Sequence, residues 1–165
     1  MAKKTKRKST VAQEVEKAAK LLQRLVRLKA SDDHGYCQCV TCGKIDHYKS
    51  MQGGHFIPRG RTVFKLYEPN CNPQCPRCNL WGMKQAHYVL RYRQWMVDYH
   101  GERRVKAMER LAWRASPKFD REEVIQFARD LKEQIKEQEW RIGEIKGGQF
   151  SKNQAGCASI KKKKG

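Results

Sequence analysis

Apolar residues recur every three or four positions in four stretches of the chain, and this spacing predicts four helices. Thr10 can cap the first helix. The apolar seam of this helix consists of Val11, Val15, Ala18, Leu22 and Leu25. Further helices are expected over 85–100, over 102–114 and from the capping pattern Asp120-x-x-Glu123 to Gly147. The seam of the first helix needs a partner, which is either the domain itself or a second copy of the chain.

The segment between the first two helices shows the patterns of turns and short strands. The turn formers of Ser31–Gly35 precede a strand expected over Tyr36–Thr41. Residues 44–56 are expected to form a hairpin-like pair of short strands, the second carrying Met51–Ile57. A basic loop follows over 58–69. The pattern therefore predicts an α+β fold that is mostly α.

The length of 165 residues fits one compact domain with two basic ends. We expect the domain over 10–148, a disordered arm over 1–9 and a disordered tail over 149–165. The formal net charge of +19, from 36 Lys+Arg against 17 Asp+Glu, favours a polyanionic partner, with nucleic acid as the first candidate. The basic ends can attract phosphates without reading sequence, although Lys161–Lys164 alone fits a solubilising or localisation tail equally well.

The chain contains no apolar run of the ~18 residues that a membrane span needs, and its basic start is not followed by the apolar region of a signal peptide. We therefore expect a soluble, cytoplasmic protein without a membrane partner. In a reducing compartment, the seven cysteines favour metal binding over disulfides.

Two Cys-x-x-Cys pairs frame the middle of the chain. Each pair forms a tight turn that can direct two sulfurs at one ion, so together they predict one tetrahedral Zn²⁺ per chain. Four thiolates leave no open position for water, so the zinc is expected to be structural. The expected ligands are Cys39, Cys42, Cys75 and Cys78. Cys37 and Cys71 lie close to the pairs and remain alternative ligands, whereas Cys157 is expected to be a free thiol.

Several motifs resemble those of one nuclease family. Asn70-x-x-x-x-Cys75-x-x-Cys78-Asn79 is similar to the N-x-x-x-x-C-x-x-C-N run of the ββα-metal (HNH, His-Me finger) nucleases, and Gly54-His55 falls where these enzymes place their catalytic histidine. More narrowly, three segments resemble the bacteriophage NinG/Rap recombination endonucleases over about residues 20–100. These segments are Cys39-Val40-Thr41-Cys42-Gly43, Gly54-His55-Phe56-Ile57-Pro58-Arg59 and Asn70-Cys71-Asn72-Pro73-Gln74-Cys75. The resemblance implies a small zinc-stapled HNH-like core with flanking helices.

The resemblance also implies roles for individual residues. His55 is expected to act as the general base, because a neutral imidazole with a pKa near ~6.5 accepts a proton at cellular pH. Asn79 is expected to offer its amide oxygen to a catalytic Mg²⁺ or Mn²⁺. Arg59 is a candidate phosphate clamp, supported by Arg61 and Lys65. Asn70 is expected to orient the loop or the histidine.

The chain departs from its relatives at the metal site. Many relatives carry an Asp one or three residues before the histidine, where this chain has Gly54 and Gln52. With Asn79 as the one obvious neutral ligand, Mg²⁺ is expected to bind the free protein weakly and to be recruited by DNA phosphates. Asp46 and His47 remain open as further ligands.

The resulting interpretation is a metal-dependent endodeoxyribonuclease that cuts Holliday junctions or D-loops in the cytoplasm of a bacterial host. Because resolving a junction takes two cuts, a homodimer is expected. Two alternatives remain open. One is a sequence-specific or nicking HNH endonuclease, and the other is a non-catalytic zinc-containing nucleic-acid-binding protein.

Overall fold

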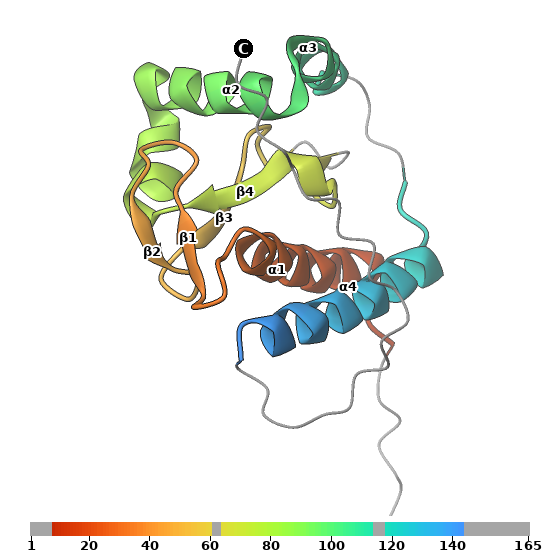
Figure 1. Ribbon diagram of the computed structural model, residues 1–165. Helices are drawn as coiled ribbons and strands as arrows, with labels where there is room; N and C mark the ends of the chain where they lie inside the picture. The colour runs from red at the N-terminus through yellow and green to blue at the C-terminus, as the bar shows by residue number, and fades with distance from the viewer. Residues whose placement is uncertain (1–7, 61–63, 114–117, 144–165) are drawn as a thin grey trace, which may run out of the picture.

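The computed structural model describes residues 8–60, 64–113 and 118–143, which form a mostly helical α+β fold with two small sheets (Figure 1). Its main elements in chain order are α1 (Val11–Lys29), β1 (Tyr36–Gln38), β2 (Ile45–His47), β3 (Gln52–His55), β4 (Cys71–Gln74), α2 (Ala86–His100), α3 (Glu102–Leu111) and α4 (Arg121–Arg141). Three short helical turns join them: η2 (Glu68–Asn70), η3 (Arg77–Trp81) and η4 (Gly82–Lys84). The predicted arm over 1–9, apart from its last two residues, and the whole of the tail over 149–165 lie outside the described residues.

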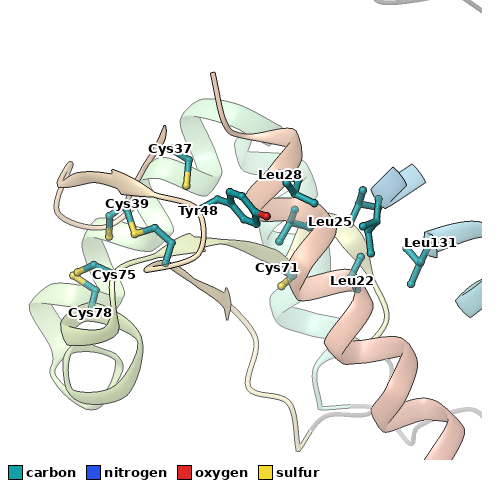
Figure 2. Packing of buried hydrophobic residues seen from close by; sticks show 13 residues of the cluster. Leu22, Leu25, Leu28, Cys37, Cys39, Tyr48, Cys71, Cys75, Cys78 and Leu131 are labelled. Carbon is teal, nitrogen blue, oxygen red and sulfur yellow. The ribbon is translucent and has the colours of Figure 1, made fainter. Parts of the chain in front are cut away.

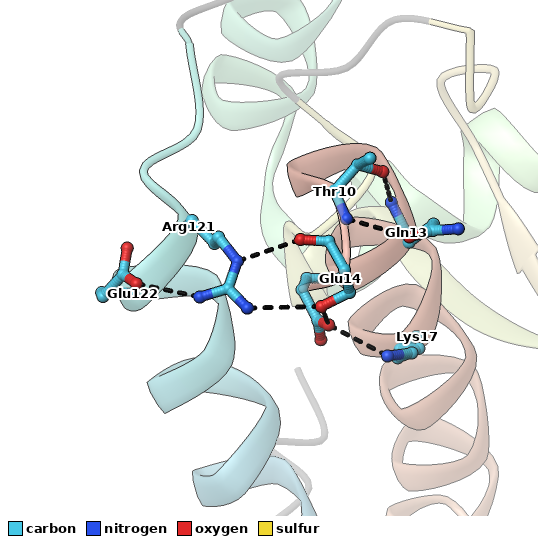
Figure 3. A network of polar contacts seen from close by, with 7 residues as sticks. Thr10, Gln13, Glu14, Lys17, Arg121 and Glu122 are labelled. Carbon is cyan, nitrogen blue, oxygen red and sulfur yellow. Dashed lines mark hydrogen bonds and ion pairs between the residues drawn. The ribbon is translucent and has the colours of Figure 1, made fainter. Parts of the chain in front are cut away.

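Helix α1 begins where the sequence predicts. The Thr10 hydroxyl accepts a hydrogen bond from the Gln13 amide (3.3 Å), and the Gln13 side chain accepts one from the Thr10 amide (2.9 Å). Figure 3 shows this capping box beside a polar network in which Glu14 binds Lys17 and Arg121 reaches back toward α1. Arg121 Nε donates to the Ser9 carbonyl (3.1 Å), which ties the start of α4 to the start of α1.

Helices α1 and α4 lie side by side and run in the same direction (Figure 1). Their apolar faces meet through Val15, Ala18, Val124 and Ala128. At the far end, Arg141 donates to the carbonyl oxygens of Leu28, in the last turn of α1, and of Ser31, just after the helix, both at 2.9 Å. Helix α4 therefore covers part of the α1 seam that the sequence left open to a second copy. The helix is described as far as Arg141, and the predicted end at Gly147 lies outside the described residues.

The strands pair differently from the sequence prediction. The predicted hairpin within 44–56 is wrong, because β2 pairs with β1 and β3 pairs with β4, both antiparallel. The first cysteine turn closes the β1–β2 hairpin, since the Cys39 amide donates to the Lys44 carbonyl (2.8 Å). The Val40 amide donates to the Pro73 carbonyl (2.9 Å), which joins this turn to β4. The first cysteine turn therefore connects the β1–β2 hairpin to the β3–β4 sheet.

The β3–β4 sheet lies between α1 and α2 (Figure 1). On one side it packs on α1, where Leu22, Leu25 and Leu28 join Cys71 in a buried cluster (Figure 2). On the other side the fully buried Tyr92 of α2 donates its hydroxyl to the Gly54 carbonyl (2.9 Å). The strand that carries His55 is therefore held on both faces.

Helix α2 matches its predicted range within one residue and ends before Gly101, whose φ of 84° favours glycine. The aromatic residues of α2 lie partly in the core and partly at the surface. Tyr92 is part of the core, whereas Trp95 stacks on the exposed Tyr99, with ring centroids 5.0 Å apart. Within the described ranges, every helix is too short or too polar to span a lipid bilayer.

Replacing Gly53 with alanine should destabilise the fold, because a Cβ at this position would lie 2.7 Å from the Gln23 Cα in the backbone of α1. We expect Gly53→Ala to lower the free energy of unfolding by about 1–3 kcal/mol, as for other overpacked positions. Gly60→Ala is the matched control, since a Cβ there meets nothing within 4 Å. Urea denaturation of both variants measures the difference, and equal stability would show that β3 does not press on α1 in this way.

Candidate functional site

The four predicted cysteine ligands meet in space. The Sγ atoms of Cys39, Cys42, Cys75 and Cys78 all lie within 4.8 Å of one another. Cys42 Sγ and Cys75 Sγ are 3.8 Å apart, and a tetrahedral zinc site with Zn–S bonds of about 2.3 Å requires an S–S separation of about 3.8 Å. The donor set therefore fits a structural zinc ion. Among the described residues, this group does not include Cys37 or Cys71, and Figure 2 shows Cys71 next to α1 instead.

The thiols are also in an environment that suits a cation. Burial raises the pKa of the Cys78 thiol, and hydrogen bonds with the neighbouring Cys42 and Cys75 raise it further. Without a cation the Cys78 thiol is therefore protonated. A bound divalent ion would compensate the charge of closely spaced thiolates and would join the two turns through metal–sulfur bonds.

His55 is the last residue of β3, and its side chain is only 8 % exposed. Its Nε2 lies 3.2 Å from the Lys65 carbonyl oxygen. A carbonyl oxygen only accepts hydrogen bonds, so Nε2 carries the proton and Nδ1 is the basic nitrogen. Burial lowers the pKa of His55, which keeps the imidazole neutral at cellular pH.

Asn79 lies in the π-helical turn η3, directly after the zinc-site residue Cys78. Its Nδ2 donates to Gln52 Oε1 of β3 (2.7 Å), which directs its Oδ1 the other way. That Oδ1 lies 3.0 Å from the position that a Cβ on Gly54 would occupy. The structure therefore places the Asn79 oxygen against the residue that precedes His55.

Two of the predicted phosphate-binding residues share one carboxylate. Arg59 Nη2 lies 2.7 Å from Glu16 Oε1, and Lys65 Nζ lies 2.9 Å from Glu16 Oε2. The hydrogen bonds from Lys65 and then from Arg59 lower the pKa of Glu16 to about 2, so it stays ionised. Arg61 lies outside the described residues.

Asn70 holds the loop that carries Arg59. This fully buried side chain accepts from the Ile57 amide (2.7 Å) and donates to the carbonyl oxygens of Ile57 (3.0 Å) and Phe64 (3.1 Å). It therefore bridges the two sides of the loop.

Asp46 and His47 lie on β2, in the sheet that does not contain His55. Asp46 binds Lys44 at 2.9 Å, and His47 packs against the Tyr36 ring. Neither of these contacts brings Asp46 or His47 to Asn79.

No functional role was assigned from the sequence to three residues near the site, Glu16, Gln52 and Gln74. Glu16 contacts Arg59, and Gln74 contacts Gly54, only once the chain has folded. Gln52 was named only as a position where a carboxylate is missing. The adjacent glycines Gly53 and Gly54 were the available clue, since side chains from α1 and β4 occupy the space beside them.

Metal binding by the cysteines can be measured directly. Cys78→Ser should lose the bound zinc and much of the stability, because it removes one of four ligands from a cluster that joins two turns. Elemental analysis of the purified protein and thermal melting with and without a chelator measure both effects. The control Cys37→Ser should keep one zinc per chain. A zinc content unchanged in Cys78→Ser would show that the ion, if bound, uses other ligands.

Removing the Glu16 carboxylate should strengthen DNA binding, because Arg59 and Lys65 would then be free to contact phosphates. For Glu16→Gln we expect a several-fold higher affinity and a salt dependence steeper by about one or two counterions. Glu133→Gln changes the charge equally and breaks the exposed Glu133–Lys136 ion pair, so it controls for net charge. Fluorescence anisotropy titrations at several salt concentrations measure both quantities. Equal behaviour of the two variants would exclude a phosphate site at Arg59 and Lys65.

Comparison with known proteins supports the predicted family. No curated protein and no solved structure matches the chain. The model of one protein family, described as the bacteriophage lambda NinG protein, matches residues 1–140. This range includes both cysteine pairs, His55 and Asn79. Since the match covers most of the chain, the protein belongs to the bacteriophage lambda NinG family.

Proposed function

We propose that the chain is an HNH-type, metal-dependent endonuclease that cuts branched DNA in recombination. Membership of the NinG family points to a function in phage recombination. The observation that carries the finer proposal is the position of Asn79 Oδ1 against Gly54, next to a histidine whose Nε2 is held by a backbone carbonyl. A base and a metal-binding oxygen on neighbouring elements are the minimum that phosphodiester hydrolysis needs.

In this mechanism His55 Nδ1 removes a proton from the water that attacks the phosphorus. The Lys65 carbonyl keeps the imidazole in the required tautomer, and burial keeps it neutral. Because the side chain is 8 % exposed, access of water and phosphate to Nδ1 is the most demanding requirement of the mechanism.

The residues around Gly54 fit a catalytic cation of the Mg²⁺ or Mn²⁺ type, because amide oxygens are hard ligands. When bound, such an ion would neutralise charge on the phosphate and stabilise the departing 3′ oxygen. Asn79 Oδ1 would hold it, and Gln52 would keep the Asn79 amide in the required orientation. A structural zinc at the cysteine cluster would fix Asn79 through its neighbour Cys78.

DNA would approach the exposed residues around this site. Arg59 and Lys65 would exchange Glu16 for a phosphate. The turn that carries Asn79 adds the exposed Arg77 and the indole of Trp81, which is 65 % exposed. An exposed aromatic ring beside a basic side chain suits the unstacked bases of a branch point. The basic ends at 1–9 and 149–165 would add attraction to phosphates without sequence preference.

We also propose a homodimer, since a junction needs two cuts. In the described part of the chain, α4 and the β3–β4 sheet cover much of the α1 seam, so a second copy would use a different surface.

The low exposure of His55 favours a second candidate function, a non-catalytic zinc-containing protein that binds nucleic acid. In that case His55 would only join β3 to the loop through the Lys65 carbonyl. A sequence-specific or nicking endonuclease differs from the first proposal in its substrate alone.

Cleavage assays distinguish these functions. The zinc-loaded wild type, supplied with Mg²⁺ or Mn²⁺, should cut a synthetic four-way junction or D-loop in preference to a linear duplex. His55→Ala and Asn79→Ala should bind the junction normally and lose about 10²–10⁴-fold in cleavage rate. His34→Ala, at an exposed turn, is the matched control and should cut normally.

Each other outcome has a definite meaning. Binding without cleavage by the wild type would exclude the nuclease and favour the binding protein. Equal cleavage by the wild type and His55→Ala would exclude His55 as the general base. Equal cutting of junction and linear duplex would favour the nicking or sequence-specific enzyme.

A further inference from the structure

Gln74 of β4 carries a buried oxygen without a hydrogen-bond partner in the described part of the chain. Its side chain is 0 % exposed, and its Nε2 donates to Thr41 Oγ1 (2.6 Å), inside the first cysteine turn. Its Oε1 is buried and accepts no hydrogen bond. A buried polar atom left in this state costs roughly 1–3 kcal/mol, so it calls for an explanation.

The unpartnered oxygen is aimed at the candidate catalytic site. A Cβ on Gly54 would collide with Gln74 Oε1 and would lie 3.0 Å from Asn79 Oδ1. The amide nitrogens of both side chains are held elsewhere, by Thr41 and by Gln52. Both oxygens therefore face the same space beside Gly54.

Two acceptor oxygens that face one space repel each other unless a donor or a cation lies between them. Amide oxygens are suitable ligands for Mg²⁺ and Mn²⁺. The Gln74 oxygen also occupies the space that a side chain at position 54 would need.

We propose that Gln74 Oε1 is a second ligand of the divalent cation, beside Asn79 Oδ1. This inference rests on the proposed nuclease function and adds a residue to its metal site. Thr41 and Gln52 are then positioning residues, because each binds the nitrogen of one amide and leaves the oxygen for the cation. Glycine at position 54 is required because any side chain would displace the Gln74 oxygen.

The proposal can be tested by Mn²⁺ binding to the zinc-loaded protein without DNA, followed by electron paramagnetic resonance of the free ion. Asn79→Asp and Gln74→Glu each place a carboxylate on a proposed ligand atom and should tighten Mn²⁺ binding by about tenfold or more. Gln85→Glu adds the same charge at the exposed residue before α2 and should leave the affinity unchanged.

A second variant covers the case in which a buried glutamate prevents folding. Gln74→Met keeps the length of the side chain and removes the oxygen. In the Asn79→Asp background, where binding is tight enough to measure well, adding Gln74→Met should weaken Mn²⁺ binding several-fold. Zinc content and melting temperature verify the fold of each variant.

The outcomes separate this inference from the proposed function. If Asn79→Asp tightens Mn²⁺ binding and Gln74→Met leaves that affinity unchanged, Gln74 is not a ligand, a buried water on Oε1 becomes the explanation, and the nuclease proposal stands. If Asn79→Asp has no effect and the wild type does not cleave, the proposed function fails. If Asn79→Asp has no effect and His55→Ala cleaves like the wild type, the proposed catalytic residues and their metal site fail together.

Discussion

The four-sulfur cluster is the constraint on which the rest of the structure depends. Each sheet has two strands of three or four residues, and an isolated two-stranded sheet of this size is marginal in water. Through Cys39 and Cys42 the cluster holds the end of the β1–β2 hairpin, and through Cys75 and Cys78 it holds β4 and η3. Asn79 follows the last of these cysteines, so its position depends on the cluster. A metal at the cluster would stabilise the site without taking part in its chemistry.

The sequence predicted the features whose causes are local. Thr10 and Gln13 are three residues apart, and Gly101 ends a helix by its own backbone preference, so helix α1 and helix α2 followed from spacing and caps. The pairing of β3 with β4 joins Gln52 to Gln74 across a long loop, and no local pattern encodes such a pairing. The convergence of the four cysteines was predictable because two Cys-x-x-Cys pairs suited to one ion specify a long-range contact in the sequence itself.

The side chains that shape the site were harder to foresee for the same reason. Glu16 reaches Arg59 from α1, and Gln74 reaches Gly54 from β4, in both cases through tertiary packing. Sequence reasoning treated Gly54 as a missing ligand. In the structure this glycine leaves room for the Gln74 oxygen from another strand. With Gln74 as the proposed ligand, the site would keep its ligand count while the ligand moves to a different position in the chain.

A site built from neutral amides has an electrostatic consequence. A carboxylate would attract a cation to the free protein, but it would also repel the DNA phosphates that must approach the same point. Amide oxygens attract the cation only weakly and do not repel the phosphates strongly. The cation and the phosphate would therefore enter together and stabilise each other. Glu16 fits the same logic, because in the absence of DNA it supplies the negative charge that Arg59 and Lys65 need, on a half-exposed side chain that a phosphate can displace. Charge compensation at the site would therefore come from the substrate, which couples assembly of the catalytic centre to the binding of DNA.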